Sequence, residues 1–355
     1  MTMSSPARAE EATLQDVRQR LLEQVEDRLD RFIAAERARW CAVAPHAAIP
    51  IDAVETLVRA GGKRIRPIFC LSGYLAVGGD PTDPGVVDAA AALELLHAFA
   101  LLHDDVLDNS STRRGQPTAH VRYAAEHERH GWSGEARRFG DGVAILAGDL
   151  AYAWADQLAT GLSPAARAVW DELSTEMIVG QSIDIVVAAQ RDADPDLARW
   201  IALCKSGHYT IHRPLLLGAT VAGRPDLTGA FEEYGLAVGE AFQLRDDLID
   251  AFGDSQATGK PAGLDFDQHK MTLLLALVVQ RDERVRDLVT GWDRAGWDAA
   301  ALRGLLEEAG VRADVERHID DLVRTARQAI AGTPLAAVWR EELADLAGRI
   351  AYRDR

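Results

Sequence analysis

Residues 89–108 read AAAALELLHAFALLHDDVLD, and this stretch decides the fold. Its first part is almost entirely apolar, and Asp104, Asp105 and Asp108 close it. On a helix, Asp104 and Asp108 lie one turn apart on the same face, separated by about 6 Å along the axis. An isolated acidic cluster is more often a solvated helix face, but a helix that is otherwise buried has little reason to end in three free aspartates. The stretch therefore predicts a buried helix that ends in a cation site.

The same spacing returns in residues 242–250, FQLRDDLID, with Asp246, Asp247 and Asp250. One such pentad is weak evidence, whereas two pentads that each end an apolar helical segment are strong evidence. If they face each other across a helical bundle, six carboxylates lie at one end of it. Their mutual repulsion requires divalent cations, which in turn suit a polyanionic ligand. Carboxylates together with waters and substrate phosphates are the usual ligands of Mg²⁺.

A basic segment, GGKRIRP at residues 61–67, interrupts this acidic chain. Lys63, Arg64 and Arg66 stand at an expected helix start, where local charge and the helix dipole both favour an anion. Single basic side chains are more often solvated, and a lone His on an apolar helix is more often a core residue. His97, however, lies two turns before Asp104 and on the same face.

Helical periodicity runs through the whole chain and predicts an all-α fold. Apolar residues recur at three- and four-residue steps over residues 14–40, 86–107, 144–158, 165–187 and 231–252. We find no strand alternation and no hairpin signal of the Asn-Gly type, and the polar stretch 127–142 predicts a surface loop. No linker divides the chain. We therefore expect a flexible end at 1–12 and one bundle of about a dozen helices at 13–355.

Composition restricts the class of protein. The chain has 355 residues, of which 48% are hydrophobic, and a net charge of −16, so a nucleic-acid-binding surface is not expected. The cysteines Cys41, Cys70 and Cys204 are far apart and show no metal-ligand spacing, as is typical of thiols in a reducing cytosol. No run approaches ~18 uninterrupted apolar residues, which predicts no membrane span. A cytoplasmic protein is expected.

Five ordered motifs resemble those of the trans-isoprenyl diphosphate synthases, the polyprenyl synthetase family, and most closely its geranylgeranyl diphosphate synthases. The resemblance extends from about Val54 to Leu277, and we expect it to continue to the end of the chain. The matching pieces are GGKRIRP, ELLHAFALLHDDVLDNSSTRRGQPT, GQSIDI, KSGHYT, and FQLRDDLIDAFGD followed by GKP and HKMT. It implies an isoprenoid synthase-like bundle around a central apolar cavity, and a homodimer.

The resemblance also implies a role for each matching residue. Mg²⁺, three ions per active site with Mn²⁺ as a substitute, is expected on Asp104, Asp108 and Asp246, supported by Asp105, Asp247 and Asp250. The diphosphate of the allylic substrate is expected on Arg113, Lys205, Lys260 and Lys270. The diphosphate of isopentenyl diphosphate is expected on Lys63, Arg64, Arg66, His97 and Arg114. Ser206 and Gln243 are expected beside the developing cation. Ser206 stands where Thr is commoner, and His269 stands where Gly is commoner, which leaves the placement of Lys270 open.

The expected reaction joins isopentenyl diphosphate to an allylic diphosphate of five to fifteen carbons. Pyrophosphate leaves, the double bond of isopentenyl diphosphate attacks the allylic cation, and a proton is lost. No protein nucleophile is needed, and the chain shows no Ser-His-Asp or Cys-His pattern. An apolar interior would exclude water and house the growing tail.

Product length depends on where the tail is blocked. Phe99 and Ala100, five and four residues before the pentad, resemble the pattern of one class of geranylgeranyl diphosphate synthases. At about 5 Å per isoprenoid unit, a C20 tail runs along about 13 helix residues, to near Ala91 in the small stretch 89–92. Helix geometry turns Phe99 about 140° from the Asp104 face, so Met177 or Gln181 could form the floor. A C20 product is expected, with C15 and longer products open.

Three other functions compete with this one. A class I terpene cyclase uses one Asp-rich pentad, but its second metal motif is of an Asn/Asp–Ser/Thr–Glu type that is not found here. A non-catalytic modulating subunit typically lacks aspartates in one pentad. A Ca²⁺-buffering module requires a loop with a central Gly and a terminal Glu, which is missing.

Overall fold

The computed structural model of the protein describes residues 6–190, 194–253, 266, 270, 272–290 and 299–353. Helix α1 begins at Pro6, inside the stretch 1–12 for which a flexible end is expected, and residues 1–5 lie outside the described part, so that expectation stays a prediction. The elements in chain order are α1 (Pro6–Val43), η1 (Pro45–Ala47), α2 (Ala48–Arg59), α3 (Ile65–Ala76), α4 (Pro84–Leu107), β1 (Thr112–Arg113), β2 (Gln116–Pro117), α5 (Ala119–His130), α6 (Ala136–Leu158), η2 (Ala159–Gly161), α7 (Pro164–Gln190), α8 (Pro195–Ala202), η3 (Leu203–His212), α9 (Arg213–Val221), η4 (Pro225–Leu227), α10 (Thr228–Phe252), α13 (Leu273–Val279), α14 (Glu283–Thr290), α15 (Ala299–Glu308), α16 (Val311–Ala331) and α17 (Ala337–Ala351).

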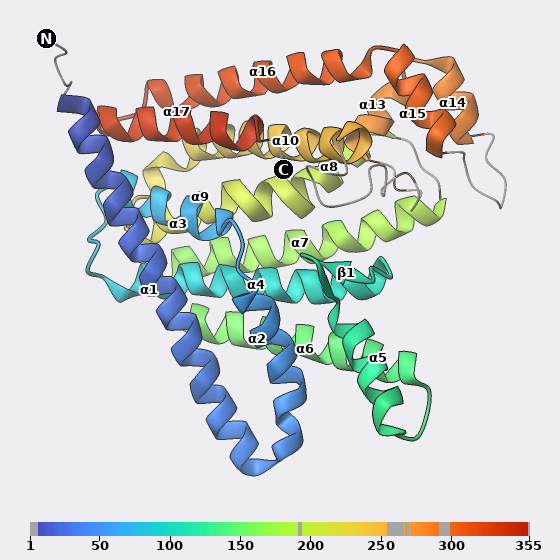
Figure 1. Ribbon diagram of the computed structural model, residues 1–355. Coiled ribbons are helices and arrows are strands. Elements are labelled where there is room, and N and C mark those ends of the chain that lie inside the picture. Colours follow the sequence, from blue (N-terminus) through green and yellow to red (C-terminus); the bar gives the residue numbers. More distant parts are fainter. Residues whose placement is uncertain are drawn as a thin grey trace, which may run out of the picture.

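Helix α4 is the central helix of the bundle. It begins where Asp83 accepts a hydrogen bond from the Gly85 N–H at 2.8 Å and where Pro84 takes the first helical position. It then packs against α1, α3, α6 and α9 (Figure 1). By length and composition alone α4 could cross a membrane, but 67% of its apolar window is buried inside the bundle, as in a core helix. The predicted all-α class is confirmed.

Helix α10 carries the second pentad and packs against α16, α17 and η3. Segment η3 is a π-helix, a geometry that the sequence periodicity does not predict. Its Gly207 lies against Gly239 of α10, where a Cβ built on Gly239 would come within 2.5 Å of the Gly207 Cα atom. The two glycines therefore bring Lys205 and Tyr209 of η3 close to the pentad helix.

The expected loop at 127–142 is wrong. Helix α5 continues to His130 and α6 begins at Ala136, so that only residues 131–135 connect them. The two helix ends are held together by ring contacts, because His127 packs 5.3 Å from Phe139, and Trp132 packs 5.2 Å from the same ring. The polar residues that suggested a loop belong mainly to the solvent-facing sides of two helices.

A short hairpin follows α4, although the sequence showed no hairpin signal. Strands β1 and β2 pair antiparallel through a turn of two residues, Arg114 and Gly115. Their φ values are 53° and 73°, as a type I′ turn requires. An Arg replaces the Asn that usually marks this turn, which is why the sequence did not reveal it.

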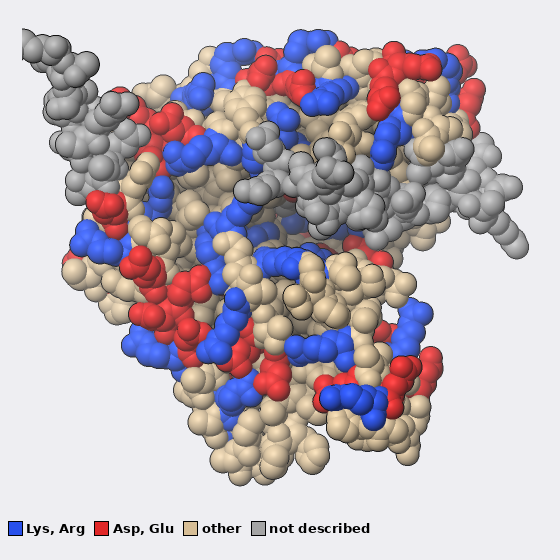
Figure 2. Space-filling model, in the orientation of Figure 1, with Lys and Arg blue, Asp and Glu red and all other residues tan. Residues whose placement is uncertain are grey.

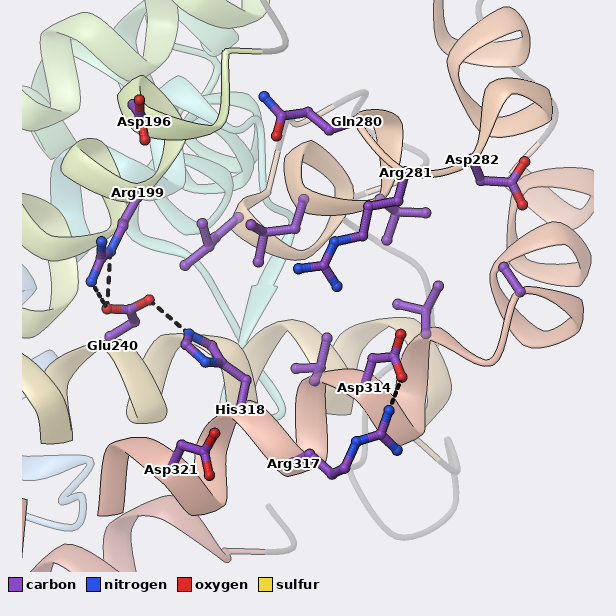
Figure 3. A pocket seen from close by; sticks show the side chains of 16 residues that line it. Asp196, Arg199, Glu240, Gln280, Arg281, Asp282, Asp314, Arg317, His318 and Asp321 are labelled. Atoms are coloured by element: carbon purple, nitrogen blue, oxygen red, sulfur yellow. Dashed lines mark hydrogen bonds and ion pairs between the residues drawn. The ribbon is translucent and has the colours of Figure 1, made fainter. Parts of the chain in front are cut away.

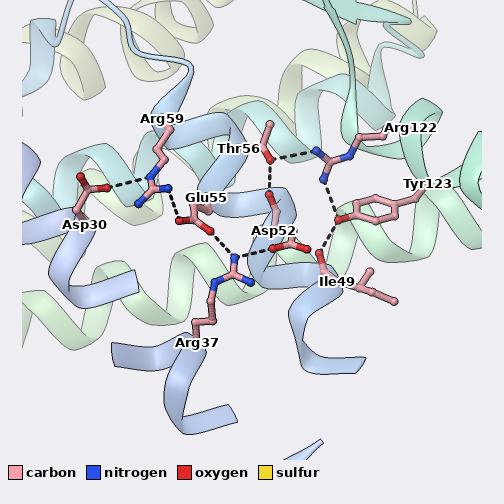
Figure 4. Close-up of polar contacts among 9 residues, drawn as sticks. All are labelled: Asp30, Arg37, Ile49, Asp52, Glu55, Thr56, Arg59, Arg122 and Tyr123. Carbon is pink, nitrogen blue, oxygen red and sulfur yellow. Dashed lines mark hydrogen bonds and ion pairs between the residues drawn. The ribbon is translucent and has the colours of Figure 1, made fainter. Parts of the chain in front are cut away.

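Ion pairs fasten α2 to α1 on one side, and a hydrogen bond fastens it to α5 on the other (Figure 4). Arg37 of α1 pairs with Asp52 at 2.6 Å, and Arg59 pairs with Asp30 of α1 at 3.1 Å. Arg122 of α5 donates to the Thr56 hydroxyl at 3.0 Å. These contacts fix α2, which leads directly into the GGKR half of the GGKRIRP motif before α3 begins at Ile65.

Candidate active site

Two pockets of different chemistry meet in the middle of the bundle. The anion pocket, about 500 Å³, is lined by Gly62, Lys63, Arg64, Ile65, Arg66, Glu94, His97, Arg114, Phe242 and Asp246. The apolar cavity, about 360 Å³, is lined by Arg66, His97, Phe99, Ala100, Leu101, His103, Asp104, Leu107, Met177, Ile178, Gln181, Ser182, Ile185, Lys205 and Tyr209. Arg66 and His97 line both pockets, so the two pockets adjoin at these side chains. A hollow bordered by Lys and Arg side chains opens near the middle of the face in Figure 2.

Cations crowd the anion pocket. Burial lowers the pKa of Arg114, and the nearby charge of Arg64 lowers it further. Burial likewise holds the pKa of His97 well below its usual value, and Arg66 adds to the effect, so His97 is neutral at pH 7. Neighbouring positive charges that lower each other's pKa repel one another, so this cluster of basic side chains favours an anionic ligand.

Tyr209 joins the two shared residues and was missed by the sequence reasoning. Its hydroxyl lies 2.9 Å from Nδ1 of His97, and the Arg66 guanidinium lies 4.0 Å from its ring centroid. Arg66 also donates to the Thr210 hydroxyl at 2.9 Å. The motif KSGHYT contains both residues, but only the π-helix brings them to Arg66.

Arg64 differs from the other basic residues of its motif. It occupies a left-handed conformation (φ 48°) at the start of α3, and its guanidinium bonds Glu26 at 2.5 Å and also the buried carboxylate of Glu94. Because Glu26 and Glu94 occupy N–H groups on two edges of the guanidinium, this geometry favours a role in shaping the pocket. Its predicted role as a substrate ligand stays a prediction.

The first pentad has one unbonded carboxylate and two bonded ones. Within the described residues no hydrogen bond or ion pair reaches the Asp104 carboxylate; burial raises its pKa, Lys205 opposes that rise, and Asp108 adds to it. Asp105 is buried and accepts from Arg113 at 2.7 Å, which ties the hairpin to the end of α4. Asp108 accepts from Lys270 at 2.7 Å. The pentad is thus placed beside a cation from the far part of the chain.

The second pentad lies at the edge of the anion pocket. Asp246 lines that pocket and pairs with Arg353, whose guanidinium lies 3.7 Å from the Phe242 ring centroid. Asp247 is buried and accepts from Gln243 at 2.7 Å and from the Leu274 N–H at 3.1 Å. Asp247 therefore positions α13, and Gln243 supports it. Arg353 was missed because a single Arg after the last helix belongs to no motif.

These carboxylates suit an ion that takes few ligands from the protein. In the described ranges no three His, Cys, Asp or Glu side chains are close enough to hold an ion by themselves. Mg²⁺ is commonly bound by one or two carboxylates, with waters and substrate phosphates as the other ligands. The unbonded Asp104 and the half-exposed Asp246 fit that mode. The site residues therefore fit Mg²⁺ together with a phosphate-bearing ligand.

The structure describes the positions of only some of the other predicted site residues. Lys205 lines the apolar cavity beside Asp104 and bonds Asp184 of α7 at 2.5 Å. The side chain of Ser206, the next residue of η3, is outside what the structure describes, and so are Lys260 and His269. Asp250 is half-buried at the end of α10.

The apolar cavity does not follow the path expected for the hydrocarbon tail. It runs beside α4 only from His97 to Leu107, and residues 89–92 are fully buried in the core instead of lining it. The expected path to Ala91 is therefore not supported, since these alanines serve the close packing of α4 with its neighbours. Phe99 does line the cavity despite its turn away from Asp104, as do Met177 and Gln181.

A larger pocket, about 660 Å³, lies between α8, α10, α13 and α16 (Figure 3). Its ionic lining consists of Asp196, Glu240, Asp282, Asp314, Asp321, Arg199, Arg281, Arg317 and His318. Five carboxylates against three arginines and one histidine do not suit a polyanion. The buried Glu240 is moreover occupied by Arg199 at 2.7 Å and by His318 at 3.2 Å.

Comparison with known proteins agrees with the site. Residues 49–295 match the family model of polyprenyl synthetases. The chain is 32% identical to a geranylfarnesyl diphosphate synthase of Aeropyrum pernix over 82% of this chain and 89% of that protein. It is 34% identical to a geranylgeranyl diphosphate synthase of Mycobacterium tuberculosis over 78% of this chain and 76% of that protein.

Among solved structures, the fold matches a geranylgeranyl pyrophosphate synthase from Corynebacterium glutamicum, which was crystallised with isoprenyl diphosphate and magnesium. The TM-score is 0.86 and the identity 37%, over 94% of this chain and 99% of that one. The family match covers more than half of the chain, and the resemblance seen in the motifs is confirmed. The chain belongs to the polyprenyl synthetase family, whose members are prenyltransferases that elongate prenyl diphosphates.

Proposed function

We propose that this prenyltransferase condenses isopentenyl diphosphate with allylic diphosphates of five to fifteen carbons and releases geranylgeranyl diphosphate. The observation that carries the proposal is the meeting of the anion pocket and the apolar cavity at Arg66 and His97. One substrate has only a diphosphate and a short alkene, while the other also has a growing hydrocarbon tail. A cationic pocket that adjoins an apolar cavity suits this pair.

Isopentenyl diphosphate binds in the anion pocket, with its diphosphate on Lys63, Arg66 and Arg114. Neutral His97 faces this diphosphate without adding charge, and Tyr209 fixes the ring through Nδ1. The guanidinium of Arg353 on Phe242 adds one more cation at the rim. These contacts direct the double bond of the substrate toward the apolar cavity.

The allylic substrate lies with its tail in the apolar cavity and its diphosphate between the two pentads. Arg113, Lys205, Lys260 and Lys270 stabilise the charge of the leaving pyrophosphate. Asp104, Asp108 and Asp246 would hold Mg²⁺, three ions per site with Mn²⁺ as a substitute, which supplies the remaining positive charge for the leaving group.

The chemical step needs no protein nucleophile. The C–O bond breaks, the alkene attacks the allylic cation, and a proton passes to the released pyrophosphate. We assign to Gln243 and Ser206 the stabilisation of the allylic cation, and the apolar walls keep out water that would quench it.

The deciding experiment is chromatography of the products that the purified chain makes from dimethylallyl, geranyl or farnesyl diphosphate with isopentenyl diphosphate and Mg²⁺. A main C20 product is expected, because Phe99 and Ala100 line the cavity. Only C15, or C30 and longer, would contradict the proposed length. No product from the chain alone would favour a modulating subunit.

We also propose a cytoplasmic homodimer that pairs through α6 and α7. All three cysteines are free thiols, which suits a reducing compartment. Exposed apolar side chains that do not line the apolar cavity lie on both helices, namely Ile145, Leu146, Val179 and Val186. Light scattering should find a dimer that Leu146→Glu weakens, whereas Val43→Glu, at the more exposed end of α1, should leave it intact.

A further inference from the structure

The wall of the apolar cavity on the α6 side is built around the Phe99 ring, which packs against two other rings at steep angles. The Phe99 ring lies 4.7 Å from the His103 ring and 5.2 Å from the Tyr152 ring, between centroids. Phe99 and His103, one turn apart on α4, both line the cavity, whereas Tyr152 of α6 does not. Tyr152 therefore stands behind Phe99 as seen from the cavity.

His103 cannot move away to make room for Phe99. Its Nε2 atom lies 2.9 Å from the Ile145 carbonyl oxygen and 3.6 Å from the Asp149 carboxylate. Its ring also lies so close to α6 that a Cβ built on Gly148 would come within 2.2 Å of it. Phe99 is thus bounded by a fixed ring toward the pentad and by Tyr152 toward α6.

We propose that Tyr152 is a positioning residue for product length: its ring holds Phe99 against the cavity and so limits the tail. This inference rests on the proposed function. Side chains in a close-packed interior move into space that a neighbour vacates. Loss of the Tyr152 ring gives Phe99 room to swing toward α6, and the cavity becomes longer.

The hydroxyl of Tyr152 takes no part in this role. In the described part of the chain no residue bonds it, and the Tyr152 side chain contacts Phe99 through its ring. Tyr152→Phe keeps the ring and removes only the hydroxyl, so it is a matched control for Tyr152→Ala. Tyr152→Leu is a second test variant, because it keeps apolar bulk on α6 but lacks the ring.

The experiment compares the product lengths that these proteins make from dimethylallyl and isopentenyl diphosphates with Mg²⁺, with the rate of the first condensation as a second readout. In Tyr152→Ala and Tyr152→Leu, products longer than the main wild-type product should rise roughly fivefold, as expected from the loss of one aromatic pair. The value of kcat/KM for the first condensation should stay unchanged, because Tyr152 does not touch the reacting atoms. Tyr152→Phe should behave as wild type.

An unchanged product distribution in the folded Ala or Leu variant would overturn the proposal, and so would an equal lengthening in Tyr152→Phe. A general fall in the first condensation without longer products would indicate only a structural role. If the wild-type protein makes no prenyl product at all, the proposed function fails. If the wild type elongates and the variants make products of the same lengths, only the role of Tyr152 fails.

Discussion

Lys270 Nζ lies 2.7 Å from the Asp108 carboxylate, although 162 positions separate the two residues in the sequence. The contact joins the segment after the second pentad to the end of the first. It also answers the question raised by His269, because Lys270 reaches the pentad despite the unusual residue before it. The ammonium group stands where an anionic ligand between the pentads would meet it.

Lys270→Ala should raise the KM for the allylic diphosphate by roughly 10- to 100-fold, the cost of one charge-assisted hydrogen bond. Initial rates at varied allylic substrate measure the change, and Lys270→Arg should recover part of it. An unaltered KM in the Ala variant would show that this ammonium group serves only Asp108.

Asp104→Asn and Asp246→Asn should each lower kcat by about three orders of magnitude, because the leaving group loses its bound positive charge. Circular dichroism should show a folded protein in both cases. Asp345→Asn, a change at an exposed carboxylate of α17, is the matched control and should retain full activity. Near-normal turnover in either pentad variant would refute the metal assignment.

Gly239→Ala should destabilise the protein by about 1–3 kcal/mol, since its Cβ would overlap Gly207 of η3. Gly142→Ala, inside α6 with no atom within 4 Å of the added Cβ, should instead stabilise by about 0.5–1 kcal/mol. Urea unfolding of the two variants gives both values. Equal effects in the two variants would contradict the tight contact of η3 with α10.

Acid should destabilise the fold through His212. This side chain is 2% exposed, and both its ring nitrogens are buried without a partner in the described structure. Burial, with the nearby charges of Arg213 and His208 adding to it and Glu176 opposing, lowers its pKa to about 3. The unfolded chain takes up a proton near pH 6.5 that the folded chain excludes, so stability falls as the pH drops from 6.5 toward 3, by about 1.4 kcal/mol per unit.

His212→Leu removes this term. Between pH 7.5 and 5, wild type should lose about 2 kcal/mol more than the variant in urea titrations. The pKa of Glu176 is about 2 because Arg213 and His208 bond it against the effect of burial, so that group titrates outside this window. Parallel pH dependence in the two proteins would show that His212 is solvated.

The sequence predicted the parts of the fold that depend on repetition. Three-to-four-residue periodicity was enough for the bundle, and the two pentads and the basic motif at 61–67 pointed to residues that line the two central pockets, while the role of the pentads as metal ligands stays a prediction. Single residues were harder. Tyr209 acquires its place from a π-helix, and Arg353 from the packing of α17, and neither has a local pattern. The hairpin escaped because Arg114 adopts a positive φ usually taken by Asn. The alanines at 89–92 were misread as open space because composition does not distinguish a void from a tight helix contact.

The close packing of these alanines restricts which parts of the enzyme can vary during evolution. Larger residues on the first half of α4 would have to be accommodated in the centre of the bundle, at a cost to folding. The side wall built on α6 lies at the periphery and could vary with little harm to the scaffold. Natural or engineered diversification of chain length would therefore proceed more easily from the margin of the bundle than from its axis.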